Sequence, residues 1–294
     1  MRLSEIEVVS PRNVQDALSV VYERAGRIKP IAGSTDAIIQ LKEGSLETNE
    51  LLDLSNLGEL RYLHREGSVV HIGALSTYSD IIESPVLSSS CRILIEACKT
   101  IGSLQIQNRA TIGGNLGNAS PAGDAIPPLY VLDANVKVQS RERSRLIPID
   151  KFFLGYRKID LKPSELITEI SFESIEKPND GTFLKLGPRD GYCISLVSLA
   201  ICAKWTPSGD RFSDVRVAFG AVAPVVFRAR KCEEHLSNRT LTDDTIWNAG
   251  KIASDEASPI SDLRASAGYR RAVIPALLYK AVHALIGSRQ KREK

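Results

Sequence analysis

The sixteen residues from Arg109 to Asp124 constrain this chain more than any other segment. Four of them are glycines, at positions 113, 114, 117 and 123, and no charged residue lies between the arginine and the aspartate. Glycine weakens helix and strand interiors, so a core element would not use so many. An isolated Gly-Gly-Asn would be typical of a tight turn with a bulge. Over sixteen residues, the composition instead predicts a backbone that approaches a polar ligand, with successive N–H groups converging on phosphate oxygens.

A second glycine turn lies upstream, in the sequence Pro30-Ile-Ala-Gly-Ser-Thr-Asp36. An apolar stretch reaches Ala32, glycine turns the chain, and Ser34 or Thr35 can cap a helix that runs towards Lys42. The free N–H groups and the positive dipole end of a helix start form an anion site. Taken alone, the segment is more often an ordinary N-cap. It also lacks the Gly-x-Gly-x-x-Gly and Gly-Lys-Ser/Thr patterns. Two such loops, about eighty residues apart, predict a pyrophosphate held from two sides.

These residues resemble a known family. Ile31–Asp36, Gln107–Asn115 and Ala119–Asp124 are similar to the FAD-binding medium subunit of the xanthine dehydrogenase/carbon monoxide dehydrogenase family of molybdenum hydroxylases. The similarity continues in order along nearly the whole chain, through Phe152-Phe153, Lys162–Ile167, Lys185–Arg189, Ile194–Ser198, Ala218–Pro224 and Arg264–Arg271. The glycine-rich block is specific, whereas the C-terminal signatures are individually weak. One departure is Ser34, where many relatives carry a second glycine.

The resemblance implies FAD as the cofactor and implies which residues bind it. The backbone of the first loop matches one that wraps the FAD pyrophosphate, and Asp124 matches a carboxylate that binds FAD; an Asx-type turn closed by Asp124 is the alternative. Ile167 matches a position that meets the flavin ring, although core packing is typical of such a strand residue. Lys185 matches a lysine that reaches the cofactor, although an exposed strand lysine would look identical. Tyr192 is either a ring-stacking residue or a surface-loop tyrosine.

No catalytic residue is predicted. The complete set of predicted cofactor-binding residues is Pro30, Ile31, Ala32, Gly33, Ser34, Thr35, Asp36, Ala37, Ile101, Ala110, Thr111, Gly114, Asn115, Asn118, Gly123, Asp124, Leu166, Ile167 and Lys185.

The resemblance also implies an α+β fold. It predicts a PCMH-type FAD-binding domain over residues 1–176, with subdomains of about 1–56 and 57–176. A C-terminal domain over 177–294, with a small antiparallel sheet and a helical bundle, is expected to follow. The polar segment 173–181 contains Pro178 and Gly181 and marks a domain boundary on its own composition.

Hydrophobic periodicity predicts the individual elements. Helices are expected over 13–25, 91–101, 226–236, 242–257 and 268–287, with Pro275 starting or kinking the last one. Strands are expected near 28–32, 51–54, 69–73, 136–138, 147–149, 195–205 and 215–223.

Composition narrows the classes of partner. A net charge of +3 gives no argument for nucleic acid. No stretch approaches eighteen apolar residues, and the first residues lack the apolar core of a signal peptide. We therefore expect a cytoplasmic protein that binds neither nucleic acid nor membrane.

The cysteines and histidines predict no metal centre. Iron–sulfur and zinc sites need clustered ligands, but the sequence has no Cys-x-x-Cys pair and its histidines are scattered. An odd number of cysteines in apolar segments is typical of buried free thiols. The residues concerned are Cys91, Cys98, Cys193, Cys202, Cys232, His64, His71, His235 and His283.

A redox protein without its own iron–sulfur cluster must receive electrons from another chain. The resemblance implies an iron–sulfur small subunit and a molybdopterin large subunit as partners, with NAD or another carrier as the electron acceptor. Ala218–Pro224 and Arg264–Arg271 favour a xanthine- or aldehyde-dehydrogenase type of parent enzyme. Two alternatives stay open. One is a free-standing FAD-dependent oxidoreductase, which needs its own substrate pocket and general base, and the other is a nucleotide-free scaffold that docks partners.

Overall fold

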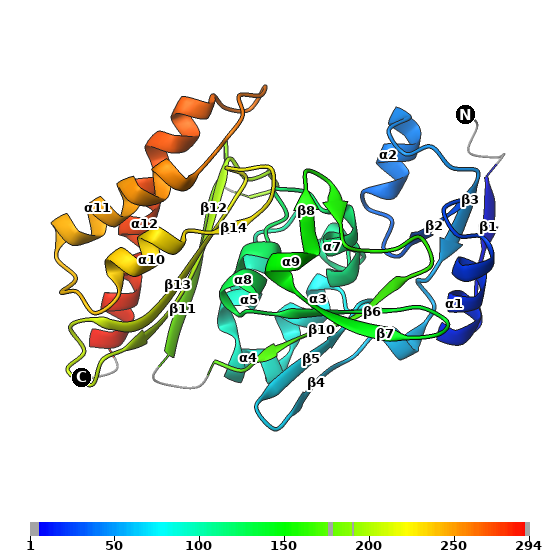
Figure 1. Ribbon diagram of the computed structural model, residues 1–294, viewed down its shortest axis with the longest axis horizontal. Coiled ribbons are helices and arrows are strands. Elements are labelled where there is room, and N and C mark those ends of the chain that lie inside the picture. The colour runs from blue at the N-terminus through cyan, green and yellow to red at the C-terminus, as the bar shows by residue number, and fades with distance from the viewer. Residues whose placement is uncertain (1–5, 176–178, 190, 292–294) are drawn as a thin grey trace.

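The N-terminal part of the chain folds around a small parallel sheet. A computed structural model describes residues 6–175, 179–189 and 191–291, and Figure 1 shows three parts that follow one another along its long axis. The first part has the strand order β1-β3-β2. Its elements are β1 (Glu7–Val9), α1 (Val14–Glu23), β2 (Ile28–Ile31), α2 (Ala37–Glu43) and β3 (Glu50–Asp53). Asn13 caps α1 by accepting the N–H of Asp16 at 2.8 Å, and the apolar face of α1 packs on the sheet.

The middle part is a five-stranded antiparallel sheet of order β4-β5-β10-β6-β7, covered by short helices. The strands are β4 (Leu63–Glu66), β5 (Val69–Gly73), β6 (Asn135–Gln139), β7 (Ser144–Pro148) and β10 (Leu166–Glu173). The remaining elements are η2 (Gly58–Leu60), α3 (Tyr78–Glu83), α4 (Pro85–Ser90), α5 (Arg92–Lys99), α6 (Leu104–Gln107), α7 (Ile112–Asn118), α8 (Ile126–Val131), α9 (Ile149–Phe152), β8 (Phe153–Gly155) and β9 (Lys158–Ile159).

One face of this sheet is apolar and the other is polar. Along β5, Val70 and Ile72 are fully buried against the helices, whereas His71 lies between them on the opposite face. This is the period-two alternation of a strand with one covered face. The antiparallel register of β4 and β5 places His64 directly opposite His71. The expectation that the histidines are scattered is therefore wrong for these two.

The C-terminal part packs helices on one antiparallel sheet, of order β11-β12-β13-β14. Its elements are β11 (Asn179–Leu186), β12 (Val197–Trp205), β13 (Phe212–Gly220), β14 (Phe227–Arg228), α10 (Arg230–Leu236), α11 (Asp243–Glu256) and α12 (Ala267–Gln290). Pro275 lies inside α12, in the turn that faces α11, where a Cβ on Gly250 would lie 2.5 Å from its Cα. A glycine at 250 therefore lets the two helices approach closely.

The fold is α+β, as predicted, and most predicted elements are present. Two differences stand out. Part of the glycine-rich segment, predicted as an irregular loop, forms the helix α7, and the expected helix 226–236 begins with the short strand β14. The predicted division between residues 176 and 177 lies outside the described residues and stays a prediction. Within the described residues, no helix combines the length and the apolar character needed to span a bilayer.

Candidate functional site

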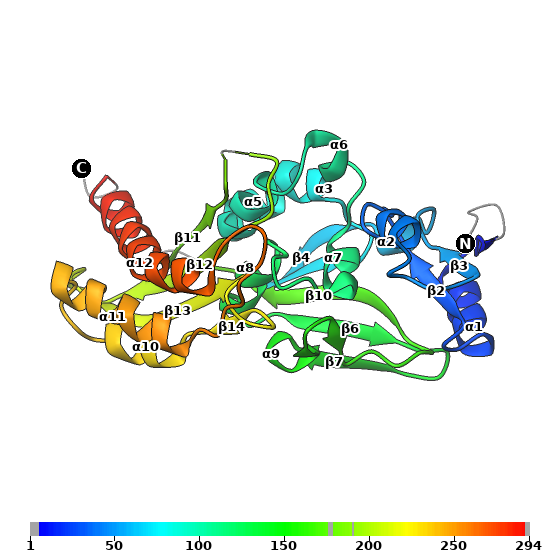
Figure 2. The same cartoon turned by 90° about the horizontal axis from the view of Figure 1, so that it is seen from above.

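A cleft of about 580 Å³ is lined by the first part of the chain on one side and the middle part on the other. The β2–α2 loop forms one wall, and α7 with the start of β10 forms the other. Figures 1 and 2 both place α2 beside α7, although the two helices are about seventy residues apart in sequence. A concave site of this size is typical of small-molecule and cofactor binding.

The β2–α2 loop presents unpaired backbone donors. Within the described residues, the N–H groups of 33–37 donate no hydrogen bond. Ser34 has a φ of 61°, a left-handed conformation that glycine adopts more readily, and its Oγ donates to Ala32 O at 3.2 Å. Ser34 therefore adopts the left-handed conformation that the turn requires, although it has a side chain. Successive free N–H groups in such a turn form a concavity that binds anions.

The two glycine turns touch one another at Gly33. A Cβ built on Gly33 would lie 1.8 Å from Arg109 O and 2.5 Å from Arg109 C. Only glycine allows this approach, because the obstacle is backbone and cannot rotate away. The structure thus brings together the two loops that the sequence analysis singled out.

The glycine-rich segment uses its N–H groups differently from the prediction. The Ile112 and Gly113 N–H groups donate to Ser76 O and Ala74 O, at 3.0 and 2.9 Å. The Gly114 N–H donates to Thr111 Oγ1 at 3.1 Å. These donors are therefore occupied by the protein. Thr111 caps α7 and the first turn of that helix docks on the end of β5, so these N–H groups are not free in this structure, and their convergence on phosphate oxygens stays a prediction.

Polar side chains complete the α7 wall. The buried Asn115 Oδ1 has no hydrogen-bond partner among the described residues, although the residue lines the cleft. Asn118 Oδ1 accepts Gln40 Nε2 at 2.8 Å and Arg157 Nη1 at 3.3 Å. Asn118 therefore ties α7 to α2 across the cleft, whereas Asn115 offers an unsatisfied polar atom that a ligand can pair.

Charges of both signs line the cleft. Lys29, Arg157 and Lys162 are exposed cations of the lining, and the buried Glu165 belongs to it as well. Arg145 donates two hydrogen bonds to the Glu165 carboxylate, from Nε to Oε1 at 3.0 Å and from Nη2 to Oε2 at 2.8 Å. Burial acts to raise the pKa of Glu165, but the hydrogen bonds from Arg145 and from the Lys162 N–H outweigh it and hold the pKa below its usual value. This anchored carboxylate fixes the loop that precedes β10.

Asp124 and Lys185 form a buried pair outside the cleft lining. Lys185 Nζ donates to Asp124 Oδ2 at 2.6 Å and to Thr100 O at 2.9 Å, and the Ser195 hydroxyl donates to Asp124 Oδ1. The two side chains are 5% and 9% exposed, so Lys185 is not the exposed strand lysine of the alternative interpretation. Burial raises the pKa of Asp124, and both donors oppose this by stabilising the ionised form. The pair links the middle part to β11.

Most of the predicted cofactor-binding residues line the cleft. Four of them do not line it: Ile101, Gly123, Asp124 and Lys185. Gly123 lies close to α7, since a Cβ at Gly123 would lie 3.1 Å from Asn115 Nδ2. Tyr192, which the sequence left open, is 67% exposed, with a φ of 46°. Sequence reasoning missed Ala74, Leu75 and Tyr78, because apolar lining residues carry no pattern that distinguishes them from the core.

Known proteins match this chain over nearly its whole length. The family described as the FAD binding domain in molybdopterin dehydrogenase matches residues 4–172, and the CO dehydrogenase flavoprotein C-terminal domain matches residues 182–285. The glyceraldehyde dehydrogenase medium chain of Sulfolobus acidocaldarius is 33% identical, over 94% of this chain and 97% of that protein. A putative xanthine dehydrogenase FAD-binding subunit of Escherichia coli is 30% identical, over 91% of each.

The fold agrees with these sequence matches. A chain of the carbon monoxide dehydrogenase of Hydrogenophaga pseudoflava superimposes with a TM-score of 0.93 at 27% identity, covering 97% of this chain and 98% of that one. The first family match alone spans more than half of the residues. The chain therefore belongs to the FAD-binding medium subunits of the molybdenum hydroxylase family, and it is an oxidoreductase subunit with FAD as its cofactor.

Proposed function

We propose that this chain is the electron-exit subunit of a molybdenum hydroxylase. In this role it receives electrons from a separate iron–sulfur subunit, which is itself supplied by a molybdopterin subunit, and transfers them to NAD or another external acceptor. The observation that carries the proposal is a cleft of about 580 Å³ with free backbone donors, in a chain whose described residues bring no cysteine into a group of three or more potential metal ligands. Iron–sulfur clusters are held by several cysteine thiolates that lie close together.

The residues of the cleft fit FAD. The N–H groups of 33–37 would hold the pyrophosphate, and Lys29, Arg157 and Lys162 add positive charge along the same cleft. Asn115 would pair its buried Oδ1 with a donor of the cofactor. When bound, FAD supplies the exchange between two-electron and one-electron chemistry. The chain itself binds, orients and encloses the cofactor.

Two of the relatives support an aldehyde- or xanthine-dehydrogenase type of parent enzyme. The two most informative names are those of a glyceraldehyde dehydrogenase and a putative xanthine dehydrogenase, at 33% and 30% identity. They support an aldehyde or a purine as the substrate of the complete enzyme. That substrate would be oxidised in the molybdopterin subunit, so the residues of this chain contribute only to the exit of electrons.

Anaerobic photometry tests this assignment. The isolated chain is loaded with FAD and mixed with an aldehyde or a purine, with and without the two partner subunits. We expect substrate-dependent loss of flavin absorbance only when both partners are present. Dithionite serves as the control, because it must bleach the flavin in both samples.

Two outcomes would replace the proposal. Bleaching by substrate in the isolated chain would make the protein a free-standing FAD-dependent oxidoreductase. Failure of the native chain to retain or rebind FAD, with the fold intact, would favour the scaffold alternative.

A further inference from the structure

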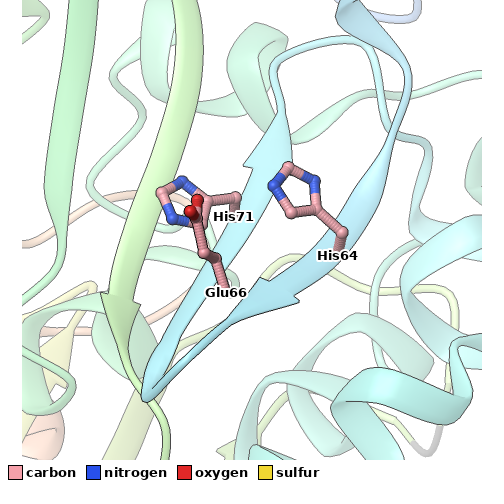
Figure 3. Close-up of side chains that lie close together, drawn as sticks. All are labelled: His64, Glu66 and His71. Carbon is pink, nitrogen blue, oxygen red and sulfur yellow. The ribbon is translucent and has the colours of Figure 1, made fainter.

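Three side chains of types that commonly bind metal ions lie close together on the β4–β5 hairpin. His64 and His71 are directly paired across the antiparallel strands, and Glu66 follows His64 by two residues. Because side chains alternate along a strand, all three point to the same, polar face of the sheet. Figure 3 shows them projecting from the two neighbouring strands toward one region.

The distances suit a shared ion. One ligand atom from each residue lies within 4.8 Å of the others, and the two imidazole rings stack with centroids 5.0 Å apart and an interplanar angle of 9°. Ligand atoms around a tetrahedral zinc ion are about 3.4 Å apart, from bonds of about 2.0–2.1 Å. The remaining gap is on the order of 1–1.5 Å. His64 and Glu66 are exposed, so their side chains are free to turn and close it.

A second layer of contacts orients the third ligand. His71 is half-buried, and its Nδ1 lies 3.3 Å from Glu169 Oε1 on the adjacent strand β10. Glu169 is itself held, because Tyr62 Oη donates to its Oε2 at 2.7 Å. A histidine that donates one ring N–H to a carboxylate presents its other nitrogen as a metal ligand. Glu169 therefore lies beside Nδ1 of His71 and leaves Nε2 as the ring nitrogen available to an ion.

We propose that His64, Glu66 and His71 form a binding site for a divalent transition-metal ion, with Zn²⁺ as the best fit. Two imidazoles and one carboxylate, with a water molecule in the fourth position, are a preferred ligand set for this ion. Glu169 acts as the positioning residue through His71. The ion would join β4 to β5, the strand that leads into Ala74 and Leu75 of the cleft.

The site is separate from the cleft, since none of its three ligands is among the cleft-lining residues. Zinc binding can therefore be measured in the FAD-loaded chain without using its activity. The full chain, first treated with chelator, competes with a chromophoric zinc indicator, and thermal unfolding is recorded with and without Zn²⁺. We expect one zinc ion per chain and a higher unfolding temperature when it is bound.

Variants assign the ligands. His64→Ala and His71→Ala should each weaken zinc binding at least tenfold, and Glu169→Gln should weaken it about 10- to 100-fold by releasing His71. His283→Ala is the matched control, because His283 is an exposed histidine beside Asp243 in the C-terminal part. Its zinc affinity should equal that of the unmodified chain.

The His64→Ala variant is decisive if the other variants do not fold, because the exposed His64 side chain can be removed without leaving a cavity in the core. Zinc affinity that is unchanged in a folded His64→Ala variant overturns the proposal. Failure of the unmodified chain to compete with the indicator at micromolar zinc overturns it too.

Discussion

Two segments that depend on glycine meet in this molecule, and they use it for different purposes. In the β2–α2 loop, glycine permits a turn in which the N–H groups of 33–37 stay free within the described residues. In the segment 109–124, glycine permits close packing: Gly113 lies against Ala74, and its N–H donates to Ala74 O. The first turn therefore offers donors to a ligand, whereas the second forms a rigid wall against which the first is placed.

The contrast shows that glycine alone does not distinguish a backbone with free N–H groups from one whose N–H groups are already paired. Both segments have the composition of a ligand loop, and both reach the cleft. The two segments differ in whether their backbone N–H groups already donate hydrogen bonds. An N–H group that is paired inside the protein is less available to a phosphate than a free one. Substitutions at the two turns should consequently have different effects, one on cofactor affinity and the other on stability.

The largest effect is expected where the second segment ends, at Asp124. Asp124→Ala leaves the buried Lys185 ammonium without its carboxylate, which should cost about 3–5 kcal/mol of unfolding free energy. Urea unfolding of the apoprotein measures this without any contribution from FAD. The double variant Asp124→Ala/Lys185→Met should recover part of the loss. A change below about 1 kcal/mol in the single variant would mean that the pair is solvated rather than buried.

The next effect concerns the first turn. Gly33→Ala places a Cβ 1.8 Å from Arg109 O, so the two turns must separate. We expect FAD affinity to fall at least about 100-fold, or about 2.7 kcal/mol. Gly58→Ala is the control, because nothing lies within 4 Å of a Cβ there. Titration of the apoproteins with FAD gives both values, and equal affinities would show that the contact between the turns does not shape the site.

Gly113→Ala should separate stability from affinity. Its Cβ would lie 2.7 Å from both Ala74 Cβ and Ala74 O, an overpacked contact that costs about 1–3 kcal/mol. Thermal unfolding of the apoprotein should report this loss, while the folded fraction binds FAD within a few-fold of the unmodified chain. A loss of affinity as large as that of Gly33→Ala would make the two turns equivalent and would remove the contrast between them.

The sequence was sufficient for the family, and most of the elements and cofactor-binding residues that it predicted are present in the fold or line the cleft. It identified both turns because glycine and small polar residues are conspicuous in a local window. It did not predict that Thr111 caps a helix inside the glycine-rich segment, because tertiary contacts to Ser76 and Ala74 stabilise that helix. Nor did the sequence predict that His64 lies opposite His71, because residues seven positions apart are brought together only by the register of the two strands. Such pairings depend on the fold, not on local pattern.

The smallest predicted effect is the most specific to the ligand. Asn115 is the residue of the α7 wall whose buried Oδ1 finds no partner among the described residues. Asn115→Ala removes a polar atom that the apoprotein does not use, so the free energy of unfolding without FAD should stay the same or rise slightly. With FAD, the variant should lose one hydrogen bond, or about 0.5–1.5 kcal/mol, which is up to about tenfold in affinity. Comparing unfolding with and without FAD isolates the difference, since a bound ligand stabilises only the folded state. If the apoprotein is destabilised and its FAD affinity is unchanged, then Asn115 is a structural residue and does not bind the cofactor.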